Sequence, residues 1–147
     1  MKIKDQVVSL ELAKKLKELG VKQEGLFAFY RKGHYWSGQT EFQPGKETLE
    51  ENVGDNVDFP HERVAVTFTV AELGEMLPYK LEEKGRATDY ETYYYLNTSL
   101  CEDNVWETSY CGLGDCGCEK IIVEKTEADS RAKMLIYLIE NKLISNF

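Results

Sequence analysis

The chain has 147 residues, 42% of them hydrophobic and 30% charged, which is enough for one domain around one core and short for two. A formal net charge of -8 removes the general attraction to phosphates on which nucleic-acid-binding proteins depend, so we expect no general nucleic-acid binding. The longest apolar run, residues 134–139, is far shorter than the ~20 residues of a membrane-spanning helix, and the N-terminal stretch lacks a secretory signal, so we expect a cytoplasmic protein without membrane contact.

The segment SLELAKKLKELGVKQ near the N-terminus predicts an amphipathic helix. Its apolar residues recur at helical spacing as Leu10, Ala13, Leu16 and Leu19. Ser9 stands where a side chain can accept hydrogen bonds from the first free amides of the helix. Gly20 follows as a residue that adopts the left-handed conformation in which many helices end.

The next segment, GLFAFYRKGHYWSG, is aromatic and roughly alternating, which predicts a hairpin that turns at Lys32–Gly33. Residues 38–61 are rich in Gly, Pro, Asn, Asp and Glu, and they predict a long, exposed, acidic loop. The alternation of Val64 and Val66 then predicts a strand. Thr69 and Glu72 have the spacing of a capping box, which opens a short helix that ends at Pro78.

The second half of the chain predicts a polar loop at residues 80–89 and then three strands, in YETYYYLNTSL, NVWETSYC and CEKIIVEKT. The last segment, TEADSRAKMLIYLIENKLISNF, predicts a helix capped by Thr126 and apolar on most sides. Such a helix crosses the core or buries its second face in another subunit, so we consider a homo-oligomer formed through it. The expected fold is a single α+β domain over 1–147, with the N- and C-terminal helices packed on a mostly antiparallel sheet of about four to six strands.

The cysteine-rich stretch CGLGDCGCEK admits three interpretations. Four thiolates could hold zinc, namely Cys101, Cys111, Cys116 and Cys118, or three of them with His34 or His61. Zinc is the only cofactor that we consider. The spacing of these cysteines, however, lacks the paired Cys-x-x-Cys knuckles of structural zinc sites. Cys111 and Cys118 could instead form a disulfide across a hairpin. A reducing cytoplasm favours the third interpretation, a glycine-rich hairpin turn with reduced cysteines.

The run YETYYYL predicts a strand with tyrosines on both faces. Tyr93 and Tyr95 share one face and Tyr94 takes the other, and one face belongs to the core. We consider Tyr93, Tyr94 and Tyr95 as a candidate interaction surface, because tyrosine suits interfaces, against the alternative of a half-exposed strand. No nucleophile elbow or phosphate-binding loop is present, so no catalytic or cofactor-binding residue is predicted.

Three blocks, SLELAKKLKELGVKQEGLF, FTVAELGEMLP and TEADSRAKMLIYLIENKLI, resemble the signature blocks of a family of small, uncharacterised phage and prophage proteins. The resemblance implies a viral accessory protein in the cytoplasm of a bacterial host, and it implies no activity and no catalytic residues. With the acidic charge, it favours a non-enzymatic protein that binds a basic host protein or a phage protein through an acidic or aromatic surface. The alternatives are a small-molecule-binding protein or enzyme with a pocket at the sheet, and a metal-stabilised module.

Overall fold

The computed structural model describes residues 2–34, 43–54, 61–82, 93–113 and 117–145. These residues form an α+β fold of three α-helices, one short 3-10 helix and seven strands. The helices are the 3-10 helix Ile3–Asp5, α1 (Leu10–Glu18), α2 (Val70–Met76) and α3 (Glu127–Glu140). The strands are β1 (Phe27–His34), β2 (Gln43–Glu51), β3 (His61–Thr67), β4 (Lys80–Glu82), β5 (Tyr93–Leu100), β6 (Trp106–Gly112) and β7 (Cys118–Glu124).

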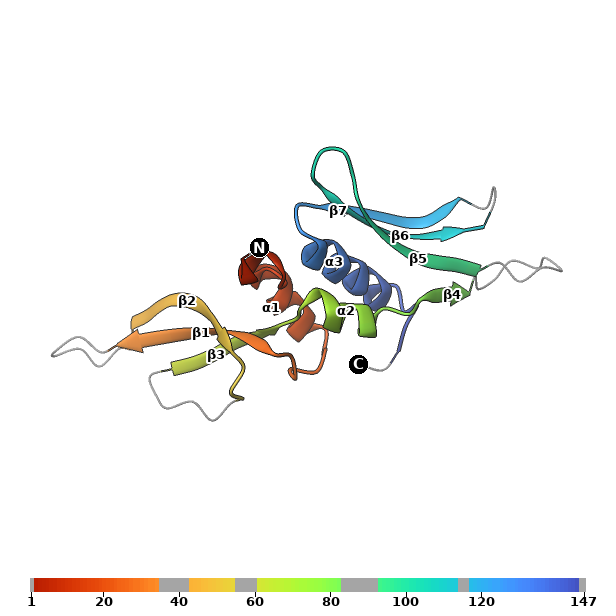
Figure 1. Ribbon diagram of the computed structural model, residues 1–147. Helices are drawn as coiled ribbons and strands as arrows, with labels where there is room; N and C mark the ends of the chain where they lie inside the picture. The colour runs from red at the N-terminus through yellow and green to blue at the C-terminus, as the bar shows by residue number, and fades with distance from the viewer. Residues whose placement is uncertain (1, 35–42, 55–60, 83–92, 114–116, 146–147) are drawn as a thin grey trace.

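The described strands form two antiparallel sheets instead of the single sheet that the sequence predicted. One sheet has the order β2-β1-β3, and the other has the order β4-β5-β6-β7. The helices occupy the space between the two sheets, with α3 against the four-stranded sheet and α1 against β3 of the three-stranded sheet (Figure 1). Neither sheet therefore needs to bury its apolar face against the other, because the helices provide the partner surface for both.

Helix α1 begins and ends where the sequence predicted, although its N-terminus is capped differently. Ser9 is the N-cap residue, but its side chain makes no capping hydrogen bond. Instead, the Ser9 backbone amide donates to Oδ1 of Asp129 at 2.7 Å, which links the starts of α1 and α3. Gly20 follows the helix with a φ of 84°, the left-handed conformation expected there.

Helix α2 has the predicted capping box. The Glu72 backbone amide donates to the Thr69 hydroxyl, and the Thr69 backbone amide donates to Oε2 of Glu72 at 2.7 Å. The other carboxylate oxygen of Glu72 accepts from the Leu26 backbone amide at 2.9 Å. One side chain therefore both starts α2 and holds the segment that leads into β1, which the local motif does not reveal.

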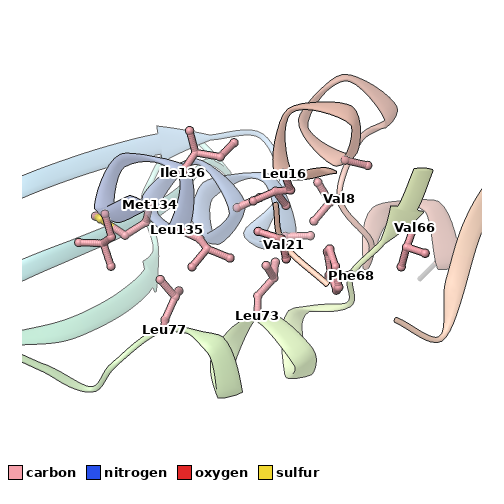
Figure 2. Packing of buried hydrophobic residues seen from close by; sticks show 14 of the residues in the cluster. Val8, Leu16, Val21, Val66, Phe68, Leu73, Leu77, Met134, Leu135 and Ile136 are labelled. Carbon is pink, nitrogen blue, oxygen red and sulfur yellow. The ribbon is translucent and has the colours of Figure 1, made fainter. Parts of the chain in front are cut away.

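The core is continuous across all three helices, and α3 lies at its centre (Figure 2). Leu73 and Leu77 of α2 point toward Leu135 of α3. The buried residues of α3 are Ala128, Ser130, Ala132, Met134, Leu135, Ile136 and Leu138. Because the four-stranded sheet, α1 and α2 of the same chain contact this helix, its broad apolar surface is used within the chain. No described helix is long and apolar enough to cross a membrane.

Three predictions about loops and turns are wrong. The sequence predicted an exposed acidic loop over 38–61, but residues 43–51 form strand β2. Two other parts of that range, 38–42 and 55–60, lie outside the described residues. No turn occurs at Lys32–Gly33, because β1 continues to His34 with only a register shift in its pairing with β2. The predicted loop at 80–89 begins with strand β4, and its remainder is not described.

The alternation of β2 is hidden by its charged residues. Glu47 lies opposite Arg31 of β1, and the Arg31 guanidinium donates to its carboxylate at 2.6 Å. This hydrogen bond, together with one from the backbone and the nearby charges of Arg31 and Lys14, holds the pKa of Glu47 below its ordinary value against the opposing effect of burial. The charged side chains of β2 find their partners on the neighbouring strand. Without that strand, the composition of β2 is indistinguishable from that of an exposed loop.

Candidate functional site

The four-stranded sheet has one side in the core and one side away from it. Tyr94 of β5 is buried and points into the core cluster, whereas Tyr93 and Tyr95 alternate to the opposite side and are half-buried. The prediction that Tyr93 and Tyr95 share a face is confirmed, and Tyr94 is removed from the candidate interaction surface. Tyr94 therefore lies on the other side of the sheet from Tyr93 and Tyr95.

The side of the sheet opposite α3 is here called the outer face. The register assigns to it Lys80, Glu82, Tyr93, Tyr95, Asn97, Ser99, Glu107, Ser109, Cys111, Cys118, Ile121 and Val123, of which Ser109 is completely buried. The strand register arranges these residues in rows. One row across the sheet contains Tyr95, Cys111 and Cys118, and the next contains Asn97, Ser109 and Ile121. Adjacent strands are about 4.8 Å apart, so side chains within a row are close neighbours.

The tyrosine end of the outer face carries one lysine and one glutamate, Lys80 and Glu82. Lys80 of β4 lies opposite Tyr95, and its Nζ is 3.5 Å from the centroid of the Tyr93 ring. This is a cation–π contact, which holds the lysine and the ring in one arrangement. The aromatic part of the outer face is therefore ordered before a partner arrives.

The β7 end of the outer face is aliphatic. Ile121 and Val123 are each 50% exposed, whereas Ile122 between them packs against the core cluster. Single exposed aliphatic residues are common on protein surfaces. Here, however, two neighbouring positions on one strand extend a surface that already contains two tyrosines. The sequence pattern IIV contained this signal, because its first and third residues face away from the second.

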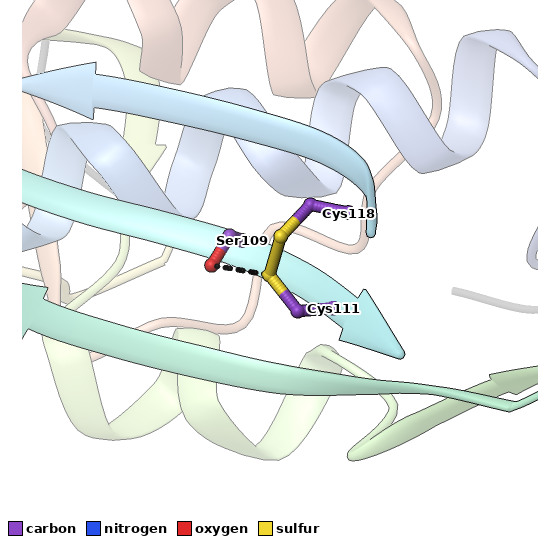
Figure 3. Close-up of a disulfide and its surroundings, with 3 residues drawn as sticks. All are labelled: Ser109, Cys111 and Cys118. Carbon is purple, nitrogen blue, oxygen red and sulfur yellow. Dashed lines mark hydrogen bonds between the residues drawn. A yellow bond between two sulfur atoms is a disulfide. The ribbon is translucent and has the colours of Figure 1, made fainter. Parts of the chain in front are cut away.

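A disulfide joins Cys111 at the end of β6 to Cys118 at the start of β7 (Figure 3). The prediction of reduced cysteines at this hairpin is therefore wrong, and the pairing is the one expected if the two strands form a hairpin. Cys111 and Cys118 occupy directly paired positions in the strand register, which is why their side chains meet. The Ser109 hydroxyl lies 3.4 Å from the Cys111 sulfur and is the only proton donor of that pair.

Among the described residues, the disulfide pairs Cys111 with Cys118, and the strands hold Cys101 away from both. Cys101 starts the β5–β6 turn at the opposite end of the sheet, and the five residue steps along β6 from Trp106 to Cys111 span roughly 17 Å. Cys116 lies outside the described residues, and His34 and His61 belong to strands of the other sheet. In the described part of the chain, no three His, Cys, Asp or Glu residues form a group that could hold a metal ion.

We expect Cys118→Ser to lower the free energy of unfolding by about 2 kcal/mol, because the disulfide closes a short loop in the unfolded chain. The effect should be partly local. The Gly112 amide donates to the Gly117 carbonyl at 2.8 Å just beyond the disulfide, and its hydrogen exchange should become faster. Urea unfolding and amide exchange measure the two effects. Cys101→Ser is the matched control, and identical unfolding of Cys118→Ser and wild type would contradict the prediction.

A cleft of about 520 Å³ lies at the β4 edge of the same sheet. It is lined by Pro78, Lys80, Leu81, Glu82, Tyr94, Glu119, Leu143 and Ile144. Glu119 also contacts Tyr137 of α3. Burial, and to a smaller extent the charge and hydrogen bond of Glu119, raise the pKa of Tyr137. The cleft therefore combines an apolar wall with two carboxylates and the ammonium group of Lys80.

Comparison of the chain with protein-family models, with curated proteins and with solved structures finds no match. The phage resemblance consequently depends on the sequence blocks alone. The function has to be argued from the geometry of the outer face and of the cleft.

Proposed function

We propose that this protein is a non-enzymatic accessory protein of phage or prophage origin that acts by binding a partner protein through the outer face. The observation that carries the proposal is the gathering of Tyr93, Tyr95, Ile121 and Val123 on one side of a sheet whose other side is core. Tyrosine provides a large contact area with few rotatable bonds, and aromatic residues are enriched at protein interfaces. The proposed phage origin is supported by the three sequence blocks.

The order of the outer face supports binding without a large entropic cost. The disulfide ties the ends of β6 and β7, and the contact between Lys80 and Tyr93 restrains the aromatic end. Binding costs less when the contacting side chains are already restrained, because less conformational freedom is lost. The strands that carry the tyrosines and the aliphatic residues belong to one hydrogen-bonded sheet, so the two ends keep a constant spacing.

The charge of the chain indicates the chemistry of the partner. Glu82 and Glu107 lie on the outer face, and the whole chain carries a net charge of -8. A partner with exposed apolar side chains bordered by lysine or arginine would complement both features. Long-range attraction from the acidic chain would increase the association rate and would weaken as the salt concentration rises.

The test is a comparative capture experiment from bacterial host lysate. We expect the wild-type chain to retain a protein that the double variant Tyr93→Ser/Tyr95→Ser loses, with an affinity at least about tenfold lower when measured with the purified partner. Leu26→Ser is the matched control, because Leu26 is 62% exposed and belongs to the segment before β1. Retention of the same proteins by all three chains, or of none by wild type, would contradict the proposal.

A small-molecule site is the second candidate, and the cleft beside β4 is the observation that favours it. Its volume of about 520 Å³ is in the range of ligand pockets. Leu81, Leu143 and Ile144 suit an apolar body, and Lys80, Glu82 and Glu119 offer charges of both signs to a polar group on the same molecule. Because neither Tyr93 nor Tyr95 lines the cleft, binding of such an amphiphilic molecule should survive the double tyrosine substitution.

The cytoplasmic location stays a prediction. The disulfide between Cys111 and Cys118 is the observation against it, because disulfides persist mainly in oxidising compartments. The proposed binding face does not depend on the compartment, since Tyr93, Tyr95, Ile121 and Val123 are positioned by the backbone of the sheet.

A further inference from the structure

Strand β7 is an open edge of the four-stranded sheet. It pairs with β6 on one side, and no described strand pairs with its other side. An unpaired edge presents backbone donors and acceptors that can accept another strand. With seven residues, including Ile121, Ile122 and Val123, β7 is long and rich in the β-branched residues that favour pairing.

The other sheet edges are less suited to pairing than β7. Strand β4 has only three residues, and β2 carries a proline, which cannot donate a backbone hydrogen bond. Strand β3 is covered, because its Val66 amide donates to Oε1 of Gln23 at 2.9 Å and its Val64 carbonyl accepts from Nζ of Lys17 at 2.8 Å. Among the described strands, β7 is therefore the edge best suited to pairing with another chain.

The sequence of β7 is complementary to itself in the antiparallel direction. If Ile122 lies opposite Ile122 of a second copy, Lys120 lies opposite Glu124 and Ile121 lies opposite Val123. By symmetry each of these unlike pairs occurs twice. Centring the pairing on Ile121 instead would place Lys120 opposite Ile122 and leave the charges without partners. The side-chain pattern therefore selects one register.

The two charged residues are already held beside the core side of the strand. Glu124 forms an ion pair with Lys133 of α3, and Nζ of Lys120 lies 5.0 Å from the centroid of the Tyr137 ring. These contacts restrain both side chains near the edge. In the paired arrangement Glu124 would lie between Lys133 of its own chain and Lys120 of the second copy.

We propose that the chain forms a symmetric dimer by antiparallel pairing of two β7 strands about Ile122, which joins two four-stranded sheets into one of eight strands. The inference is independent of the proposed partner binding. It places two outer faces side by side on one continuous sheet, so a partner with two binding elements would bind with avidity. It also differs from the oligomer expected from the sequence, which used the C-terminal helix.

The test uses charge reversal at the two complementary positions and sedimentation velocity as the readout. We expect wild type to dimerise with increasing concentration, and Lys120→Glu and Glu124→Lys to weaken dimerisation by about tenfold each, because like charges then face each other twice. An equimolar mixture of the two variants should recover the dimer, since each chain then supplies the charges that the other needs. Circular dichroism melting establishes that each variant is folded.

Lys22→Glu is the matched control, because it makes the same change in charge at an exposed position on a different part of the chain. It should dimerise like wild type. Slower hydrogen exchange of the β7 amides at high protein concentration would identify the strand that pairs. A wild-type chain that stays monomeric, a dimer that resists both single reversals, or a mixture that fails to recover the dimer would overturn the proposal.

Discussion

Leu135→Ala is expected to lower the free energy of unfolding by about 2–5 kcal/mol. Leu135 is completely buried in the middle of α3, where Leu73 and Leu77 of α2 point toward it (Figure 2). Removing its side chain beyond Cβ loses the transfer free energy of the missing carbons and leaves a cavity between helices. The loss should be near the upper end of the range, because elements on every side hold the helix and restrict its collapse into the cavity.

Urea unfolding followed by circular dichroism measures this loss. Leu100→Ala is the matched control, because Leu100 is 55% exposed at the end of β5 and should cost no more than about 0.5 kcal/mol. Since one core cluster contains Ala65 and Val66 of one sheet and Tyr110 of the other, both sheets should unfold in a single transition. Equal losses in the two variants, or separate transitions for the two sheets, would contradict this account of the core.

Tyr110→Phe is expected to lower the free energy of unfolding by about 1–3 kcal/mol at neutral pH. Tyr110 is completely buried on the core side of β6, and its hydroxyl donates to the Pro78 carbonyl at 2.5 Å. This hydrogen bond joins the four-stranded sheet to the segment between α2 and β4. The substitution keeps the ring and its packing, but it leaves the carbonyl without that donor.

Tyr110 also makes the free energy of unfolding decrease at alkaline pH. Burial raises the pKa of Tyr110 well above its ordinary value of about 10, so the folded chain keeps a proton that the unfolded chain releases. The stabilisation is fully present below pH ~10 and falls by up to about 1.4 kcal/mol per pH unit above it. Because the variant has no such proton, the difference in stability between wild type and Tyr110→Phe should narrow as the pH rises.

Urea titrations at a series of alkaline pH values measure this difference. Some pH dependence should remain in the variant, because burial and Glu119 also raise the pKa of Tyr137. Thr98→Val is a useful comparison, since it removes a hydroxyl from the same sheet without removing a titratable group. A difference between wild type and Tyr110→Phe that stays constant with pH would show that Tyr110 does not titrate as proposed.

The helices were predictable because their signals are local. The periodicity of Leu10–Leu19, the capping box of Thr69 and Glu72, and the cap at Thr126 each involve residues within a few positions of one another. The broad apolar surface of α3 also predicted burial on most sides. The sequence did not indicate whether the surface that covers α3 belongs to the same chain. In the structure, the four-stranded sheet, α1 and α2 of the same chain cover this helix.

The strands were less predictable, because a strand is completed by residues far away in the chain. Strand β2 has charges that resemble a loop until Glu47 is placed opposite Arg31. The division into two sheets was equally hidden, since nothing within a strand specifies which neighbours it joins. The candidate site was likewise only partly predictable from local sequence. Alternation placed Tyr93 and Tyr95 together, but only packing within the core cluster decided that Tyr94 is the buried one.

The sequence by itself determined the α+β class, the three helices and the negative net charge, because periodicity and capping act over short distances and charge is a sum over residues. Only the tertiary structure decided that Cys111 meets Cys118 while Cys101 lies at the opposite end of the sheet. It alone also decided that β7 is an edge and which residues form the outer face. These features depend on strand order and register, which arise from contacts between residues distant in sequence.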